Sequence, residues 1–215
     1  MEPQSDNGFA KGPTPAGKRQ RIFGLDNRPV AARRPWCPLL IGLLAVAGCV
    51  ASFAAAPGVV GGCGAGLALI MLAIAIIDWQ SFIIPDWLNA TGLALAFAHA
   101  AVLEPDQMLP AAGSAVLRAV GLSLMFYLVR YGYARVRGRQ GLGLGDVKLA
   151  AVAGAWLDLA VIPIAIELAV LAALSGYLVR QIVLRRPISA TTRLPFGFFF
   201  APAIWLGWLI GATWF

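Results

Sequence analysis

The chain has 215 residues, of which 60% are hydrophobic and 13% charged, and its formal net charge is +7 at pH 7. An ordinary soluble domain has roughly 25% charged residues, so this composition excludes that class. Long apolar stretches recur from Pro38 to the C-terminus, and about 20 apolar residues suffice to cross a bilayer. We therefore predict an all-α polytopic membrane protein.

The first 36 residues carry seven Lys and Arg side chains against three acids, among many Pro, Gly and polar residues. This composition predicts a disordered basic cytoplasmic tail over residues 1–36, followed by a membrane-embedded domain over residues 37–215. A basic tail can also bind nucleic acid. Attraction to anionic lipid is the simpler explanation beside a membrane, so we expect the lipid bilayer as a partner and no nucleic acid.

Seven apolar segments follow the tail, which predicts about six to seven transmembrane helices. The expected segments are Pro38–Ala56, Gly61–Ile77, Trp87–Leu103, Ala111–Tyr133, Val147–Leu157, Ala160–Val179 and Pro195–Trp214. The boundary between the fifth and sixth segments, near Asp158, is the least defined. The single His99 is interpreted as a packed core residue, and the three cysteines form no CxxC pair, so we expect no zinc site and no cofactor.

Arginines in the loops set the expected orientation. The loops after the fourth and sixth segments hold Arg130, Arg135, Arg137, Arg139, Arg180, Arg185, Arg186 and Arg193. Because cytoplasmic loops carry an excess of Lys and Arg, both loops and the N-terminus are expected inside and the C-terminus outside. Arg118 alone falls near the outer side, where its long side chain could snorkel to the surface.

Three aspartates fall at the predicted cytoplasmic edge. Asp78 ends the second segment, Asp86 opens the third directly after Pro85, and Asp146 opens the fifth. A charge inside the bilayer costs roughly 2.5–3.5 kcal/mol on insertion scales, so such acids are candidates for function. Asp78 and Asp146 lie on different helices at the same depth, which allows packing to bring them together.

Paired carboxylates suit peptide hydrolysis. Two carboxyl groups a few ångströms apart do not both ionise easily, so the pair shares one proton near neutral pH. The ionised member can take a proton from water while the protonated member donates to the scissile carbonyl oxygen. This chemistry needs neither a metal nor a nucleophilic side chain.

Three alternating glycines, Gly141, Gly143 and Gly145, precede Asp146. We expect them to adopt conformations closed to other residues and to leave a bare backbone strip beside which a peptide substrate can lie. A phosphate-binding loop is the alternative, but the spacing is GxGxG, and neither GxGxxG nor GxxxxGK[ST] occurs here.

Purely structural roles stay open for several of these residues. Asp146 could cap the helix that it opens, and Asp86 could cap or orient. Lys148 could orient Asp146 or reach for lipid phosphate. Asp78 closes a helix, where the dipole disfavours an anion, so it lacks such an explanation. Glu167 could belong to a buried structural pair, and no role is assigned to it.

Three stretches resemble the type IV prepilin peptidases of the GxGD membrane aspartyl protease family, peptidase family A24. The stretch "DWQSFIIPD" at residues 78–86 resembles the family's first-aspartate region, and "GLGDVKLAAVAGAWL" at residues 143–157 resembles its GxGD stretch. The stretch "LPFGFFFAPAIWLGW" at residues 194–208 resembles the start of the family's last helix. The resemblance covers approximately residues 40–215, and the first two motifs together are specific.

The resemblance implies that Asp78 and Asp146 are catalytic, with Gly143, Gly145, Lys148 and Asp86 binding substrate or supporting the pair. It implies an aspartyl endopeptidase of the bacterial inner membrane that cleaves the leaders of type IV prepilins or pseudopilins at the cytoplasmic face. Bifunctional members add an N-terminal domain with paired CxxC motifs and N-methylate the new terminus. No CxxC pair occurs here, so the resemblance implies neither the methyltransferase activity nor a zinc site.

Two other functions fit the residues taken without the resemblance. A small transporter or channel could use intramembrane carboxylates as proton or cation sites, and it predicts acids near mid-membrane and an inverted repeat. An inactive scaffold of a secretion apparatus would use the acids only as helix caps. The grouping of the main acids at one edge favours the peptidase.

Overall fold

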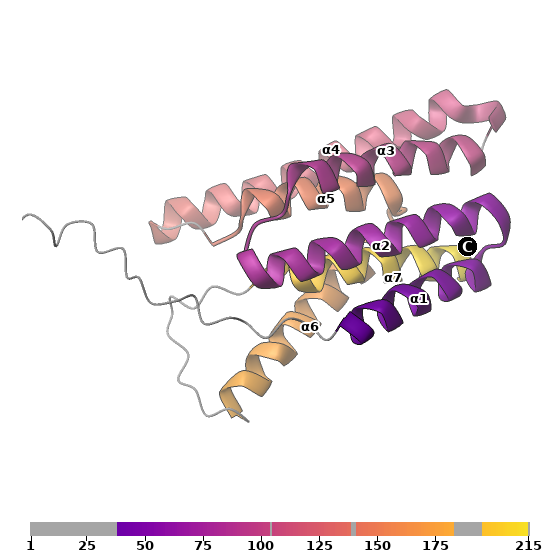
Figure 1. Ribbon diagram of the computed structural model, residues 1–215. Coiled ribbons are helices and arrows are strands. Elements are labelled where there is room, and N and C mark those ends of the chain that lie inside the picture. Colours follow the sequence, from indigo (N-terminus) through magenta and orange to yellow (C-terminus); the bar gives the residue numbers. More distant parts are fainter. Residues whose placement is uncertain (1–37, 104, 139–140, 183–194, 215) are drawn as a thin grey trace, which may run out of the picture. The chain divides into compact units, whose positions relative to one another are not determined.

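The computed structural model describes residues 38–103, 105–138, 141–182 and 195–214. Within these ranges every regular element is helical, as the sequence predicted, and there are seven α-helices (Figure 1). They are α1 (Pro38–Ala55), α2 (Gly58–Ser81), α3 (Asp86–Leu103), α4 (Met108–Arg137), α5 (Leu144–Trp156), α6 (Ile162–Ile182) and α7 (Phe196–Trp214), with a short 3-10 turn at Pro105–Gln107. The expected tail over residues 1–36 lies outside the described residues.

Five helices are long and apolar enough to cross a membrane: α1, α2, α4 with the turn before it, α6 and α7. Helix α5 has 13 residues, which corresponds to about 20 Å at 1.5 Å per residue, less than the roughly 30 Å of a bilayer core. Helix α3 carries Asp86, Asn89 and His99 among its 18 residues. The prediction of six to seven spanning helices is thus supported for five, and α3 and α5 pack among them.

The exterior of the helical unit is apolar, as a bilayer requires. Large apolar side chains are exposed along α1 and α4 over their whole length, among them Leu43, Val46, Val50, Leu117, Val120, Leu124 and Leu128. Soluble monomers rarely expose contiguous apolar patches beyond a few hundred Å². These surfaces and the five long apolar helices identify a membrane protein.

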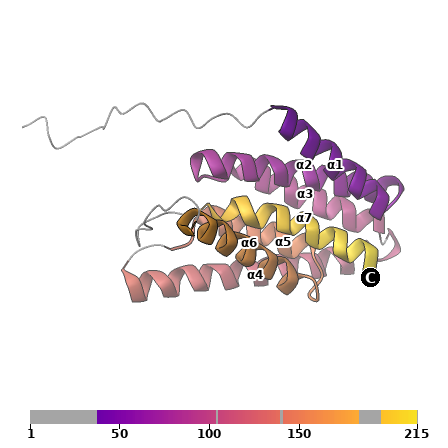
Figure 2. The same ribbon diagram turned by 90° about the horizontal axis from the view of Figure 1, so that it is seen from below.

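The helices run alternately in opposite directions, so their ends gather in two groups. One group holds the ends of α2 and α4 and the starts of α3, α5 and α7, which lie together on the left of Figure 1. The view from below shows the same grouping (Figure 2). Asp78, Asp86 and Asp146 all belong to this group, because each lies in the helical turn nearest that end.

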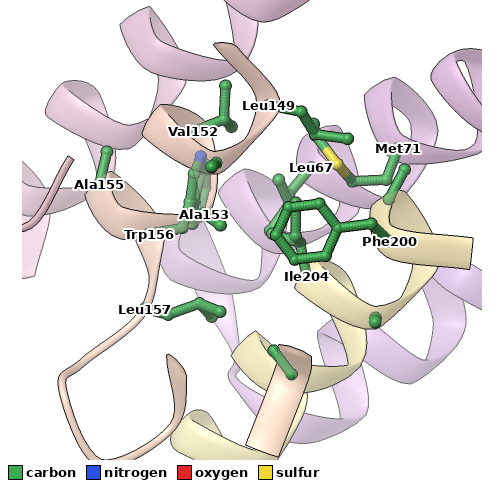
Figure 3. Close-up of a cluster of buried hydrophobic side chains, with 14 of the residues drawn as sticks. Leu67, Met71, Leu149, Val152, Ala153, Ala155, Trp156, Leu157, Phe200 and Ile204 are labelled. Atoms are coloured by element: carbon green, nitrogen blue, oxygen red, sulfur yellow. The ribbon is translucent and has the colours of Figure 1, made fainter. Parts of the chain in front are cut away.

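Side chains from α2, α5 and α7 form the centre of the core (Figure 3). Leu67, Leu149 and Ile204 are fully buried there, and Phe200 of α7 stacks on Phe126 of α4. Helix α5 packs against α3, α4 and α7, so it has no face left for solvent except at its ends. Burial on all sides explains why a helix of only 13 residues is stable without spanning the bilayer.

Two glycines set close helix contacts. A Cβ on Gly154 of α5 would overlap the backbone of Arg118, and one on Gly64 of α2 would overlap the Trp208 ring. Such positions accept no larger side chain without movement of a neighbouring helix. They fix how α5 lies on α4 and how α2 lies on α7.

Helix boundaries differ from the predicted ones chiefly at the polar ends. Helix α2 continues beyond Ile77 to Ser81, so Asp78 lies inside its last turn and not after it. Helix α4 continues to Arg137 and is capped by Gly138. Gly138 has a φ of 65°, and its amide donates a hydrogen bond to the Ala134 carbonyl, as in a glycine C-cap. Polar and basic side chains extend helices beyond the apolar run because helix ends lie in the aqueous interface.

The other charged residues and His99 have definite positions. His99 is buried against Trp156 and Trp208, which confirms the prediction of a packed core residue. Arg118 donates to the Gly154 carbonyl at 3.3 Å, so it ties α4 to α5 and does not simply snorkel. Glu167 is exposed on α6, so the suggested buried pair is wrong.

Candidate active site

Asp78 lies at the junction between α2 and the start of α7. Its side chain is buried, with the residue 5% exposed, and its Oδ2 accepts a hydrogen bond of 2.9 Å from the Phe198 amide. Phe198 belongs to the first turn of α7, whose amides have no partner within that helix. The expectation that Asp78 lacks a structural role is therefore wrong: it also caps a neighbouring helix.

Asp146 lies in the first turn of α5 and caps its own helix. Its Oδ2 accepts a hydrogen bond of 3.1 Å from the amide of Gly143, the residue that precedes the helix. The residue is 9% exposed. The capping role considered for Asp146 is thus confirmed, and the capping hydrogen bond is accepted by the Oδ2 atom of the carboxylate.

Ile84 connects the surroundings of the two aspartates. The buried Ile84 side chain lies against Gly197 of α7 and against Gly145 of α5, so that a Cβ on either glycine would meet it at 2.7 and 3.1 Å. The same Gly197 Cβ would stand 2.9 Å from Asp78 Oδ2, and Gly145 directly precedes Asp146. Ile84 therefore packs against the immediate surroundings of both acids, which lie at the same end of the helical unit.

The glycines before Asp146 act through close packing. Gly143 has a φ of −72°, and among the described residues only Gly58 and Gly138 are glycines with positive φ. The expectation of conformations closed to other residues is therefore wrong. A Cβ on Gly141 would stand 2.6 Å from the Tyr133 ring, so this loop is pressed onto α4.

Lys148 and Asp86 pair with each other. Lys148 Nζ stands 2.6 Å from Asp86 Oδ1, and their side chains are 50% and 73% exposed. The pair joins the start of α3 to the first turns of α5. In the structure Lys148 contacts Asp86, whereas the roles considered from the sequence were to orient Asp146 or to reach for lipid phosphate.

Exposed apolar side chains lie on the segments next to the two acids. Ile83 is 67% exposed, Trp87 63% and Leu144 54%. They stand on the connection between α2 and α3 and at the starts of α3 and α5. Such exposed apolar side chains fit the surface of a membrane protein.

Ile84, Gly197 and the Phe198 amide are site components that sequence reasoning did not assign. Gly197 belongs to the stretch "LPFG" that carried part of the resemblance, so a signal was present, although not one that pointed to Asp78. The Phe198 amide has no sequence signal, because any residue supplies a backbone N–H. Among the described residues no three His, Cys, Asp or Glu side chains gather as metal ligands.

Comparison with known families decides the relationship. The sequence profile of the type IV leader peptidase family matches residues 65–178, which is more than half of the chain and includes both aspartates. The chain belongs to this family. The resemblance recognised from the two aspartate motifs is thereby confirmed.

Several bacterial relatives carry the name prepilin leader peptidase/N-methyltransferase. The one from Aeromonas hydrophila is 30% identical over 189 residues, which are 85% of this chain and 60% of the relative. The one from Pseudomonas putida is 37% identical over 145 residues, 66% of this chain and 47% of the relative. The chain therefore spans about half of the length of these relatives. No solved structure gives a significant match.

Proposed function

We propose that this protein is an aspartyl endopeptidase that cleaves the leaders of type IV prepilins or pseudopilins, with Asp78 and Asp146 as the catalytic pair. The observation that carries the proposal is that two buried carboxylates, 68 positions apart in the sequence, lie at one end of the helical unit, where Ile84 packs beside both. Family membership and the names of the relatives supply the substrate class.

The hydrogen bonds of the two acids suit general acid–base catalysis. Each carboxylate accepts a hydrogen bond from a backbone amide through Oδ2, and Asp78 accepts another from the Gly197 amide, so backbone donors fix the orientation of both side chains. Because the two groups repel when both are ionised, the pair holds one proton. The ionised member takes a proton from the attacking water, and the protonated member donates to the peptide carbonyl oxygen, so that a tetrahedral intermediate forms. Its collapse cleaves the C–N bond as a proton passes to the leaving amine.

The position of the pair fits cleavage at the cytoplasmic face of the bacterial inner membrane. Arg135 and Arg137 lie in the last turn of α4, at the same end of the helical unit as both aspartates (Figure 1). Basic residues mark the cytoplasmic side of membrane helices. The same rule orients the N-terminus to the cytoplasm.

The arrangement favours a peptidase over a transporter or channel. Asp78 and Asp146 are the buried acids among the described residues, and both lie at one end of their helices. A transporter of this kind binds its ion near the bilayer midplane, between broken helices. A purely capping function leaves unexplained why two acids are buried at the same end of the helical unit with Ile84 packed beside both.

Cleavage in cells tests the proposal. The protein is co-expressed with a prepilin-type substrate that has a basic leader, a glycine and a long apolar helix, and leader loss is followed by mass spectrometry. Asp78→Asn and Asp146→Asn keep the shape of each side chain and remove its acid, so each variant is expected to lose processing by at least a hundred-fold. Asp106→Asn, in the turn before α4, is the matched control and is expected to cleave normally. Retained processing by both site variants refutes the acid pair.

A further inference from the structure

A cavity lies at the opposite end of the helical unit from the two aspartates. Its volume is about 660 Å³, within the range of roughly 300–1,000 Å³ found for small-molecule sites. It is lined from the starts of α2 and α4 and the ends of α3, α5 and α7. Small side chains create the space, among them Ala96, Ala100, Ala111, Ala115, Gly207 and Gly211.

Arg118 brings a partly used guanidinium group to this cavity. Its Nε donates to the Gly154 carbonyl, and its Nη1 donates to Ser114 Oγ at 3.2 Å. The ion pair with Asp158 is long, at 3.8 Å, and the Asp158 side chain is 74% exposed. A guanidinium carries five N–H donors, and in the described part of the chain no contact involves Nη2. Hydrogen-bonding capacity thus remains at the cavity, and the only described acid that offsets the charge of Arg118 there is the largely exposed Asp158.

His99 adds a second donor to the same cavity. Its Nε2 accepts from the Trp208 indole N–H at 3.4 Å, so the proton of the neutral ring is assigned to Nδ1. The residue is 9% exposed and lines the cavity, and no described residue accepts a hydrogen bond from Nδ1. Because His99 lines the cavity, an acceptor on a ligand can take the hydrogen bond of Nδ1.

The lining combines these donors with an apolar wall. Trp156, Trp208, Leu103 and Val161 contribute large apolar surfaces, and the indole N–H of Trp156 is already bonded to the Gly92 carbonyl at 2.9 Å. The cavity therefore offers donors at Arg118 and His99, and its other polar lining residues are Ser114 and the largely exposed Asp158. That pattern selects an anionic acceptor group attached to an apolar body.

We propose that this cavity binds the headgroup of a phosphate-bearing lipid, with the phosphate on Arg118 and His99 and the first part of the acyl chain against the tryptophans. The helix ends around the cavity lie where the spanning helices reach the membrane surface, which is the depth of phospholipid phosphates. The site is separate from the proposed peptidase site and does not depend on it.

Thermal unfolding of the full chain in an uncharged maltoside detergent tests this site. Lysophosphatidic acid is compared with the monoacylglycerol of the same chain, which differs only in the missing phosphate. At a hundred-fold excess over the dissociation constant, lysophosphatidic acid is expected to raise the unfolding midpoint by about 5–10 °C, and monoacylglycerol is not. An equal rise with monoacylglycerol, or no rise with either, overturns the proposal.

Two variants and one control separate the site from general lipid effects. Arg118→Met removes the guanidinium, and Ala111→Phe fills the cavity while keeping Arg118, so both are expected to lose the rise. Arg137→Met makes the same charge change at the exposed end of α4 and is expected to keep it. An undiminished rise in Ala111→Phe refutes the location. An equal rise with inorganic phosphate identifies a free phosphate as the ligand and overturns the lipid assignment.

Discussion

Gly197→Ala is the sharpest steric perturbation of the candidate active site. The added Cβ would stand 2.7 Å from Ile84 Cδ1 and 2.9 Å from Asp78 Oδ2, whereas ordinary van der Waals contact begins at 3.4 Å. The carboxylate must therefore move by about 0.5 Å, and the flexible end of Ile84 by about 0.7 Å, for the methyl group to fit. The methyl group changes neither charge nor hydrogen-bonding groups, so any loss of activity reports geometry.

The expected effect is a loss of cleavage in a folded protein. A misplacement of about 1 Å can lower a rate by about a hundred-fold, so a shift of half that size is expected to lower kcat about ten-fold or more. Stability changes less, because an overpacking cost of about 1–3 kcal/mol is offset by up to about 1 kcal/mol of helix propensity when alanine replaces glycine. Cleavage of a purified prepilin-type substrate gives kcat, and thermal unfolding gives stability.

Gly62→Ala is the matched control for this variant. Gly62 lies in α2, the helix that carries Asp78, and a Cβ there meets nothing within 4 Å. This control is expected to cleave at the normal rate and to be equally or slightly more stable. If Gly197→Ala cleaves as fast as Gly62→Ala, the position of the Asp78 carboxylate beside Gly197 is not important for the reaction, and the steric reasoning is refuted.

Three further predictions concern stability and are checked by reversible unfolding in detergent. Gly154→Ala places a Cβ against the Arg118 backbone and 2.8 Å from the Ala119 Cα, so it is expected to destabilise the protein by about 1–3 kcal/mol; a neutral effect would mean that α4 and α5 separate easily. Ser52→Ala removes the buried hydroxyl that accepts from the Trp205 indole at 3.1 Å and is expected to cost about 1–3 kcal/mol, whereas the exposed Ser81→Ala is expected to cost little. A double-mutant cycle on Lys148→Met and Asp86→Asn is expected to give a coupling below about 1 kcal/mol, because both side chains are largely exposed; a larger coupling would contradict the solvent screening assumed here.

The sequence predicted the helices well because apolar runs and loop charges are local signals. The connection between α5 and α6 was the hardest to place, since Asp158 interrupts an apolar stretch that continues on both sides. The structure ends α5 at Trp156 and starts α6 at Ile162. Helices α2 and α4 end later than predicted, at Ser81 and Arg137. Their last turns contain polar residues, so a prediction from hydropathy alone ends each helix too early.

The two acids were predictable as a pair because membrane sidedness puts them at one depth before any contact is known. Their partners were not predictable, since the Phe198 and Gly143 groups that bind them are backbone amides, which every residue except proline has. The packing role of Gly145 was hidden too, because its partner, Ile84, lies 61 positions away in the sequence. A glycine pattern alone does not show whether a glycine is needed for an unusual φ or for a close contact. At Gly141 and Gly145 it is the close contact that requires glycine.

The origin of the hydrogen bonds explains how this membrane protein buries two carboxylates that form no ion pair with the described residues. In the described part of the chain, neither Asp78 nor Asp146 forms an ion pair, and each accepts an amide at a helix N-terminus, of α7 and α5 respectively. Helix N-termini carry about half a positive charge and unpaired N–H donors, so they stabilise a carboxylate. A lysine or arginine in the same place would hold both acids ionised and oppose the sharing of a proton. Two helix N-termini therefore lower the cost of burying the acids while leaving one acid free to keep the proton that the proposed hydrolysis requires.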